Sequence, residues 1–293
     1  MSSNNVSKDN YSAKLRFKSV LLFLVCVLLT IICLLPIYIL IINATRTSAE
    51  VTGGVSLIPG NYLKENFHTL FNHPMFVNFK PLIGFKNSAI IAGCSTLLSV
   101  FFSALTAYGL VVYDFKLRGA AYTFILAVMM VPMQVTSVGF LQFMLKLNLG
   151  DSFIPLIIPT IAAPAIVFFM RQYLKSSFPL DIVEAARIDG CGEFRTFLTI
   201  AIPMMKPAIA VQAIFAFVAN WNNFYQPSMI LISRKQEQLT IPMMVSTITS
   251  NDKINDYGAK YAAIGLSIVP IVVVYLILSK FIVEGVALGG VKE

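Results

Sequence analysis

The sequence predicts an all-α membrane protein with six transmembrane helices, and three observations support this prediction. Of the 293 residues, 57% are hydrophobic and only 12% are charged, and the mean hydropathy is +0.78. Soluble domains carry roughly 25% charged residues, so a soluble fold of this size could not bury so much apolar surface. Six apolar stretches are long enough to cross a hydrocarbon core of roughly 30 Å. Lipid offers no partner to free backbone N–H and C=O groups, so each stretch should be helical.

The six apolar stretches cover residues 19–42, 87–112, 120–145, 154–170, 207–232 and 261–282. The first is 24 residues long. It is longer than the core of a signal peptide and no Ala-x-Ala site follows it, so we interpret it as a retained first span. Five of the six contain proline, which removes one helix hydrogen bond and tends to kink the helix. Such kinks can shape a cavity or a gate, or they can be simply tolerated in a membrane helix.

The flanking charges predict the orientation. The N-terminal tail and the short segment after the second stretch are basic, with Lys8, Lys14, Arg16, Lys18, Lys116 and Arg118. Basic residues near span ends favour the cytoplasmic side, so both termini should be cytoplasmic. The predicted organisation is a cytoplasmic tail 1–18, a first transmembrane helix 19–42, an extracytoplasmic loop 43–83, a five-helix domain 84–282 with an inner loop 171–206, and a cytoplasmic tail 283–293.

Several function classes are disfavoured by the residues that the chain lacks. The basic residues form no patch interleaved with aromatics, so the expected contact is lipid and not nucleic acid. Apart from Lys280, no ionisable side chain falls inside the six stretches, which argues against a proton-coupled carrier but leaves Na⁺ coupling open. The four cysteines and two histidines have no metal-binding spacing, and no Ser/His/Asp set suggests an enzyme. No phosphate-binding loop of the G-x-x-x-x-G-K-[ST] type occurs, so we expect ATP and Mg²⁺, if used, on other subunits.

The inner loop carries the most informative pattern. Asp181 suits a helix N-cap, with Glu184 three residues later as in a capping box. Gly190 can adopt the left-handed conformation that ends a helix, so the pattern predicts a short helix over 182–189. A second helix is expected over 193–201, with Phe194, Phe197 and Leu198 on one face, ending before Pro203.

Two short helices joined at a glycine would form an L-shaped knob. Ala185 and Ala186 would leave one side of the first helix bare, so that a partner backbone could approach it closely. The knob suits a groove in another protein. The residues alone equally allow an amphipathic hairpin on the membrane surface.

The same loop resembles the signature of importer permeases of the ATP-binding-cassette superfamily, E-A-A-x3-G-x9-I-x-L-P. The matching positions are Glu184, Ala185, Ala186, Gly190, Ile200 and Pro203. Ile202 replaces the leucine, a swap that conserves volume. The segments that begin at Pro132, Phe169 and Asn220 resemble the carbohydrate branch of this family, and the glycine-rich end resembles the maltose-type second subunit.

This resemblance implies a type I importer permease fold and a set of partners. They are a second, paralogous permease, two nucleotide-binding ATPase subunits and an extracytoplasmic solute-binding protein, in the inner membrane of a prokaryote. It implies that the coupling helix, which docks on the ATPase, uses Asp181, Glu184, Ala185, Ala186, Arg187, Asp189, Gly190, Ile200 and Pro203. Gly289, Gly290 and Lys292 would add a tail contact, although Glu293 stands where glycine is more usual.

The resemblance to the carbohydrate branch implies that the cargo is a sugar or an oligosaccharide. Neutral amides and aromatic rings suit the hydroxyls and C–H faces of such a solute. The candidate substrate path contains Gln134, Asn220, Trp221, Asn222, Asn223 and Gln226. These side chains could equally form hydrogen bonds between helices or an aromatic belt at the membrane surface. A non-sugar importer remains an alternative, as does a Na⁺-coupled secondary transporter, which would work without an ATPase.

Overall fold

The computed structural model describes residues 3–289, with side chains from Arg16 to Lys280. This part of the chain is helical and contains no strand, which confirms the all-α prediction. Four segments are long and apolar enough to cross a membrane: Arg16–Ala44, Pro74–Val112, Ile154–Ser177 and Tyr257–Lys280. Two further pairs of helices, each sharply bent, raise the number to six if each pair counts as one span.

The chain forms two compact units, one of Met1–Phe76 with Asn251–Leu266 and one of Val77–Ser250 with Ser267–Glu293. The first unit contains α1 (Ser3–Ala44), α2 (Ser48–Thr52), α3 (Leu63–Asn72), η1 (Pro74–Phe76) and the start of α15 (Tyr257–Gly289). Helix α1 begins well before predicted residue 19, because no glycine or proline precedes Pro36 within it. Its large apolar side chains are mostly exposed, as expected for a helix whose solvent is lipid.

Polar contacts within the first unit fasten the end of α1 to the start of α15. The buried amide of Asn66 donates to the carbonyl of Ala44 at 2.8 Å and to that of Arg46 at 2.9 Å. Gly258 packs directly against this amide, since a Cβ there would lie 2.5 Å from Asn66 Nδ2 and 2.6 Å from Arg46 O. Only glycine therefore fits at position 258.

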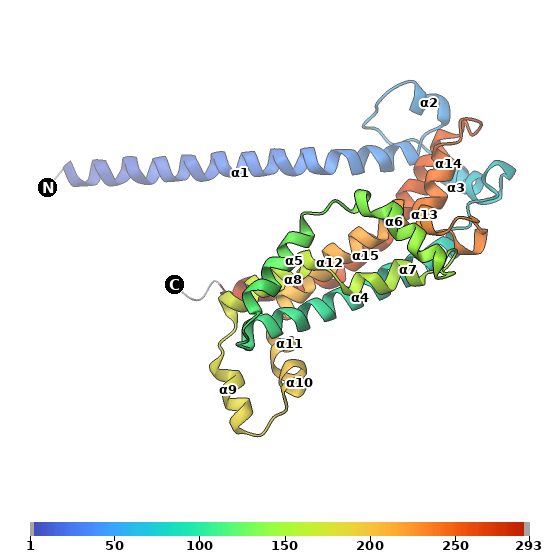
Figure 1. Cartoon of the computed structure of the whole chain (residues 1–293). Coiled ribbons are helices and arrows are strands. Elements are labelled where there is room, and N and C mark those ends of the chain that lie inside the picture. Colours follow the sequence, from blue (N-terminus) through green and yellow to red (C-terminus); the bar gives the residue numbers. More distant parts are fainter. Residues whose placement is uncertain (1–2, 290–293) are drawn as a thin grey trace. The chain divides into compact units, whose positions relative to one another are not determined.

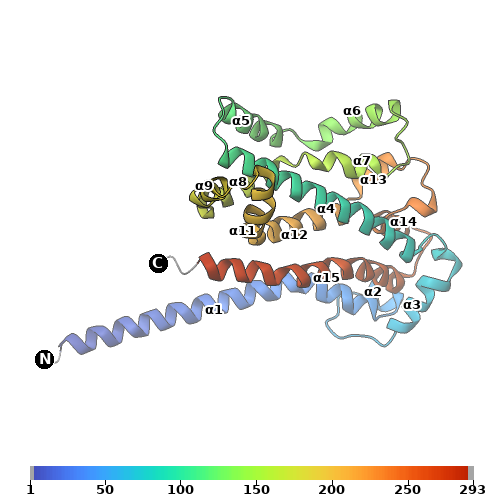
Figure 2. The ribbon, with the colours of Figure 1, turned by 90° about the horizontal axis from the view of Figure 1, so that it is seen from below.

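Helix α4 (Pro81–Val112) is the centre of the second unit. It contacts α7 (Ile154–Ile157), η2 (Ile158–Ile161), α8 (Pro164–Ser177), α12 (Lys206–Trp221) and α14 (Ile241–Thr249). Figure 2 shows α4 running between α7 and α12. Its buried faces are rich in small residues, namely Ala92, Ser95, Ser99, Ser103, Ala104 and Ala107. Small side chains let membrane helices approach closely, so α4 can be contacted on several sides at once.

Three of the six predicted spans are broken, and proline accounts for the breaks in the first two of them. The expected helix over 120–145 divides into α5 (Arg118–Met129) and α6 (Met133–Lys146), which are bent by 94°. Pro132 lies at the bend in an extended conformation and has no N–H to donate. The expected helix over 154–170 divides into α7, η2 and α8, each of which has a proline in its first turn.

The fifth predicted span, 207–232, is also interrupted. Helix α12 ends at Trp221, and α13 (Tyr225–Ile230) begins after a short turn. The following loop contains η4 (Gln236–Gln238) and is held by side chains from elsewhere in the unit. Asp151 Oδ1 accepts the N–H of Ser233 at 2.9 Å, and this bond lowers the pKa of the Asp151 carboxyl. Asn87 donates to the carbonyls of Glu237 and Leu239.

The close packing at Gly258 generates a first prediction. Gly258→Ala should destabilise the protein by about 1–3 kcal/mol, because the new methyl group displaces the amide of Asn66 from its two carbonyls. Thermal unfolding of the protein in detergent measures the effect. Gly93→Ala is the control, since a Cβ there meets no atom within 4 Å. An unchanged melting temperature for Gly258→Ala would contradict this description of the first unit.

Candidate functional site

The inner loop folds as the expected pair of short helices, with one correction at its start. Helix α9 spans Asp181–Ile188, and Leu180 is its N-cap. The predicted capping box is wrong, because no side chain caps this end and Asp181 is already helical. The helix begins one residue earlier since the carbonyl of Leu180 accepts the N–H groups of Val183 and Glu184. Asp181 and Glu184 still lie in the first turn, where acidic groups interact favourably with the helix dipole.

Gly190 ends α9 in the predicted left-handed conformation, with φ +76°. The N–H of Cys191 bonds the carbonyl of Ala186 at 2.9 Å, and the N–H of Gly190 bonds that of Arg187 at 3.0 Å. This pair of bonds is the Schellman motif, which satisfies carbonyls left free at a helix end. The turn between the two arms is therefore a well-defined structure and not a flexible linker.

The two faces of α9 have different environments. Val183 and Ala186 are buried against the rest of the second unit, so the prediction that both alanines leave a bare side is wrong for Ala186. Glu184 and Ala185 are exposed. Ile188, which the sequence analysis did not single out, is 86% exposed. An isoleucine so exposed on a short helix outside the apolar spans is suited to contact another protein.

The second arm does not end before Pro203. It runs through α10 (Glu193–Thr196), the π-helical turn η3 (Phe197–Ala201) and α11 (Ile202–Met204), which contains Pro203. The i→i+5 bonding of the π-helix changes the direction in which side chains point. Phe197 is buried whereas Phe194 and Leu198 are exposed, so the predicted common face is wrong. Ile200 is half-buried and Pro203 is exposed.

We call residues 181–204 the hairpin; Figure 1 shows α9, α10 and α11 extending away from α8 and α12. A polar cluster joins its two arms to the end of α4. Arg187 Nε donates to Glu193 Oε1 at 2.7 Å and Arg187 Nη2 donates to Oε2 at 3.2 Å. The hydroxyl of Tyr113, which caps α4, donates to the same Oε2 at 2.7 Å. Burial and this hydrogen bond raise the pKa of Tyr113 to about 12, so the phenol stays protonated and keeps donating.

Beneath the polar cluster lies an aromatic contact between α4 and the hairpin. Tyr108 is 2% exposed, and its ring lies 5.3 Å from Phe197 and 6.2 Å from Phe178, centroid to centroid. Val183 belongs to the same buried cluster. The second arm of the hairpin is therefore packed on α4, and the first arm is buried in the same cluster through Val183, although the chain connects the arms directly only to α8 and α12.

Two cavities open inside the second unit, of about 840 Å³ and 770 Å³. The first is lined by the end of α5, by α6, by the prolines near α8 and by α13. The second is lined mainly by η2, α8 and α12. Both share Met133, Pro159, Ala162, Ala165 and Gln226. The helices that proline interrupts thus surround the cavities. This favours the interpretation that the prolines shape cavities over the interpretation that they are simply tolerated in membrane helices.

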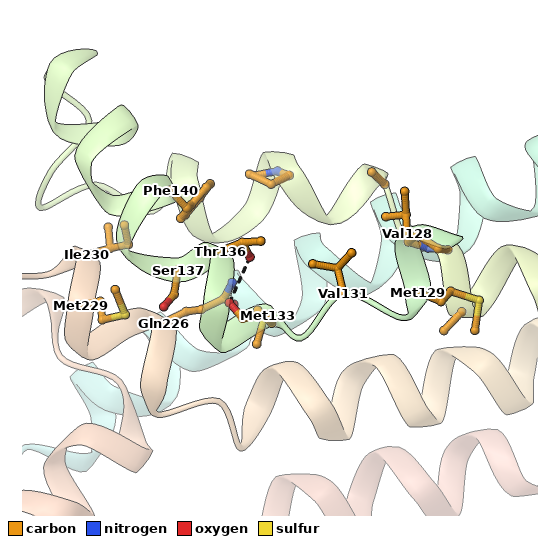
Figure 3. Close-up of a pocket in the computed structure, with 14 residues that line it drawn as sticks. Val128, Met129, Val131, Met133, Thr136, Ser137, Phe140, Gln226, Met229 and Ile230 are labelled. Atoms are coloured by element: carbon orange, nitrogen blue, oxygen red, sulfur yellow. Dashed lines mark hydrogen bonds between the residues drawn. The ribbon is translucent and has the colours of Figure 1, made fainter. Parts of the chain in front are cut away.

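The cavity walls combine apolar surface with neutral polar groups. Figure 3 shows Gln226 of α13 beside Ser137 and Thr136 of α6 at the first cavity. The second cavity adds Ser99, Thr160, Gln212, Asn220 and Asn223. Asn223 Nδ2 donates to Gln226 Oε1 at 2.8 Å, which fixes the amide shared by the two cavities. Among the described residues that line either cavity, none is charged.

The structure brings three of the six predicted path residues to the cavities, namely Asn220, Asn223 and Gln226. Gln134 and Asn222 are exposed and line neither of them. Trp221 is 3% exposed, and its Nε1 donates to the carbonyl of Ser267 on α15 at 3.0 Å. Its ring stacks with those of Phe85 and Phe217, so it belongs to the core of the unit.

Of the three tail residues predicted to contact the ATPase, one lies within the described residues. Gly289 is the last residue of α15, and Gly290 and Lys292 lie outside the described residues. Gln212 lines the second cavity and was missed by the sequence analysis, although an amide inside the apolar stretch 207–232 was the available signal. Within the described residues, no group of three His, Cys, Asp or Glu side chains could hold a metal ion.

Comparison with known proteins assigns this fold to a family. Residues 99–287 match the family described as "Binding-protein-dependent transport system inner membrane component". The chain belongs to this family. The matched segment includes α8, the hairpin, α12 and most of α15, and it confirms the resemblance inferred from Glu184, Gly190 and Pro203.

Curated relatives cover nearly the whole chain. The chain is 34% identical to the arabinooligosaccharides transport system permease protein AraQ of Bacillus subtilis (strain 168), over 90% of this chain and 92% of the relative. It is 30% identical to the lactose transport system permease protein LacG of Rhizobium radiobacter, over 94% of this chain and 97% of the relative. It is 29% identical to the sn-glycerol-3-phosphate transport system permease protein UgpE of Escherichia coli O1:K1 / APEC, over 86% of this chain and 90% of the relative. The chain is therefore a multi-pass membrane component of a transport system.

A solved structure supports the fold. It is the crystal structure of a bacterial ABC transporter involved in the import of the acidic polysaccharide alginate. One of its chains superposes with a TM-score of 0.74 at 20% identity, over 90% of this chain and 96% of that chain. The fold is the predicted type I importer permease fold.

The contrast between Gln226 and Trp221 generates a second prediction. Gln226→Leu should lower solute uptake by about three- to tenfold, the effect of one hydrogen bond lost to the solute, and should lower thermal stability only slightly, because the bond that it removes from Asn223 is local to the start of α13. Trp221→Phe should lower the thermal stability and leave uptake unchanged. It removes the hydrogen bond to α15 at a cost of about 1 kcal/mol, and Trp221 lines neither cavity. Uptake into proteoliposomes and thermal unfolding measure the two effects. Equal effects of both variants on uptake would contradict the assignment of Trp221 to the core.

Proposed function

We propose that this chain is the translocation subunit of an importer for a sugar or an oligosaccharide, driven by ATP that separate subunits hydrolyse. It lies in the inner membrane of a prokaryote with both termini in the cytoplasm. A second permease, two ATPase subunits and an extracytoplasmic solute-binding protein complete the system. The chain itself moves solute and carries out no chemical reaction.

The surface of the hairpin is the observation that carries this proposal. Glu184, Ala185 and Ile188 are exposed on α9, and Phe194 and Leu198 are exposed on the second arm. On the opposite side of the hairpin, Phe197 packs on Tyr108 of α4 and Val183 is buried in the same cluster. An apolar and acidic surface on a rigid support fits the groove of an ATPase. A hairpin lying on lipid would present a basic rim to the headgroups. Both charges in the first turn of α9 are acidic, and of the two basic side chains of the hairpin Arg187 is paired with Glu193, which leaves Arg195.

The cavities support a neutral, hydroxyl-rich solute. Their polar side chains are amides and hydroxyls, which can both donate to and accept from sugar hydroxyls. The apolar remainder of the walls suits the C–H faces of a sugar ring. Curated relatives named for arabinooligosaccharides and for lactose support the same class of cargo.

Glu184→Lys tests the coupling role. The side chain of Glu184 makes no hydrogen bond or ion pair among the described residues, so the fold should be kept while the docking charge is reversed. We expect ATP hydrolysis by the assembled complex to continue while uptake falls by about tenfold or more, because one buried interface charge pair contributes at least about 1.4 kcal/mol. Uptake and phosphate release are measured on the same proteoliposomes.

The control for this variant is Asp114→Lys, which reverses an acidic charge at the end of α4, where the side chain is fully exposed and its ion pair with Arg118, at 4.0 Å, contributes little. It should leave uptake unchanged. Normal uptake by Glu184→Lys would contradict the docking role. Uptake by this chain in vesicles that lack ATPase subunits would contradict the whole proposal in favour of a Na⁺-coupled carrier.

A further inference from the structure

The coupling role of the hairpin leaves open how a movement of its tip reaches the cavities. The chain connects the hairpin directly to α8 and to α12. The hairpin does not directly follow or precede α4 along the chain, although α4 contacts η2, α7, α8, α12 and α14. A non-covalent link from the hairpin to α4 would therefore let one movement reach all of these helices together.

The polar cluster described above forms such a link. Glu193 is its centre, because one carboxylate accepts from Arg187 on α9 and from Tyr113 at the end of α4. The guanidinium of Arg187 also lies 5.8 Å from the centroid of the Tyr113 ring. Three elements thus meet at two carboxylate oxygens, and each element contributes one side chain.

We propose that Arg187, Glu193 and Tyr113 form a brace that makes α4 and the hairpin move as one rigid body during transport. The aromatic contact at Tyr108 sets where the hairpin lies on α4. The brace sets its rotation, because a forked guanidinium and a phenol on one carboxylate fix an orientation that ring packing alone leaves adjustable. These are positioning residues, which act through the hairpin and touch no solute.

This inference rests on the proposed function, and it assigns a positioning role to two residues in the spacers of the motif and to one residue far outside it. Arg187 falls in the variable spacer after Glu184-Ala185-Ala186, and Glu193 falls in the spacer after Gly190. Tyr113 lies far away in sequence, after the second apolar stretch. The side chains of Arg187 and Glu193 are 39% and 44% exposed, so their pairing contributes modestly to stability, as expected of a positioning contact.

Distance measurements between spin labels test the brace without knowledge of the solute. One label is attached to Cys191 at the tip of the hairpin and one to Leu97→Cys on the exposed side of α4. Cys26, Cys33 and Cys94 are replaced by alanine. The complete complex with its ATPase subunits is studied without nucleotide and with ATP and vanadate. With the brace intact, we expect one narrow distance distribution that is the same in both nucleotide states.

Glu193→Gln should broaden this distribution and make it depend on nucleotide. Uptake per ATP hydrolysed should fall about threefold, the effect of losing one partly exposed charged contact. Tyr113→Phe removes only the bond to α4 and should broaden the distribution less. The double variant Arg187→Glu/Glu193→Arg restores the ion pair between the two arms in reverse, and the oxygen of Tyr113 then accepts from the guanidinium at position 193 in place of donating to a carboxylate. It should narrow the distribution again. Asp114→Asn, next to Tyr113 but outside the brace, is the matched control and should change nothing.

Several results would overturn the proposal. A distribution for Glu193→Gln as narrow as that of the parent would show that the brace positions nothing. Broadening together with a lower melting temperature than Asp114→Asn, and no recovery in the double variant, would reduce the cluster to a stabilising contact. Failure of the parent chain to bind ATPase subunits would contradict the proposed function instead, and the distributions of the isolated chain would still decide whether the brace exists.

Discussion

The close packing of α4 with its neighbours is the contact on which the rest of the second unit depends. In lipid no hydrophobic force draws one apolar helix to another, so the association depends on close van der Waals contact. Small side chains such as Ala92, Ser95 and Ala104 are fully or almost fully buried on α4 and provide that contact. Because α4 is held on several sides, the broken helices α7, η2 and α8 can leave space between them without separating. The cavities exist where proline has interrupted these helices.

The cavities and the hairpin lie at different places in the second unit, and α4 connects them. Ser99 of α4 lines the second cavity, and Tyr108 of the same helix lies under the hairpin. A helix is stiff over this length, so a displacement applied at the hairpin reaches the cavity wall with little loss. A transport subunit needs this property if its energy comes from another protein.

The sequence predicted where the apolar spans lie, because the length of an apolar stretch is a direct consequence of membrane thickness, but it did not predict the breaks within three of them. The sequence also predicted the left-handed conformation of Gly190 at the end of α9, since few residues other than glycine tolerate a positive φ. The predictions from sequence were wrong or incomplete where contacts between distant parts of the chain determine the position of a side chain. Trp221 was assigned to the solute path because tryptophan suits sugars, but its N–H bonds Ser267, 46 positions away in the sequence. Tyr113 and Glu193 meet across 80 positions, and no local pattern records that contact. Asp181 failed as an N-cap because a one-residue shift of the helix start cannot be seen in the sequence.

The central claim is that the outer surface of the hairpin is covered by a separate ATPase subunit. Ile188 tests it most directly, because this side chain is 86% exposed in the chain alone. Ile188→Cys, with the four native cysteines replaced, is treated with a water-soluble maleimide in the presence and absence of the ATPase subunits. The account predicts rapid labelling of the isolated chain and strong protection in the assembled complex. Equal labelling in both samples would contradict it.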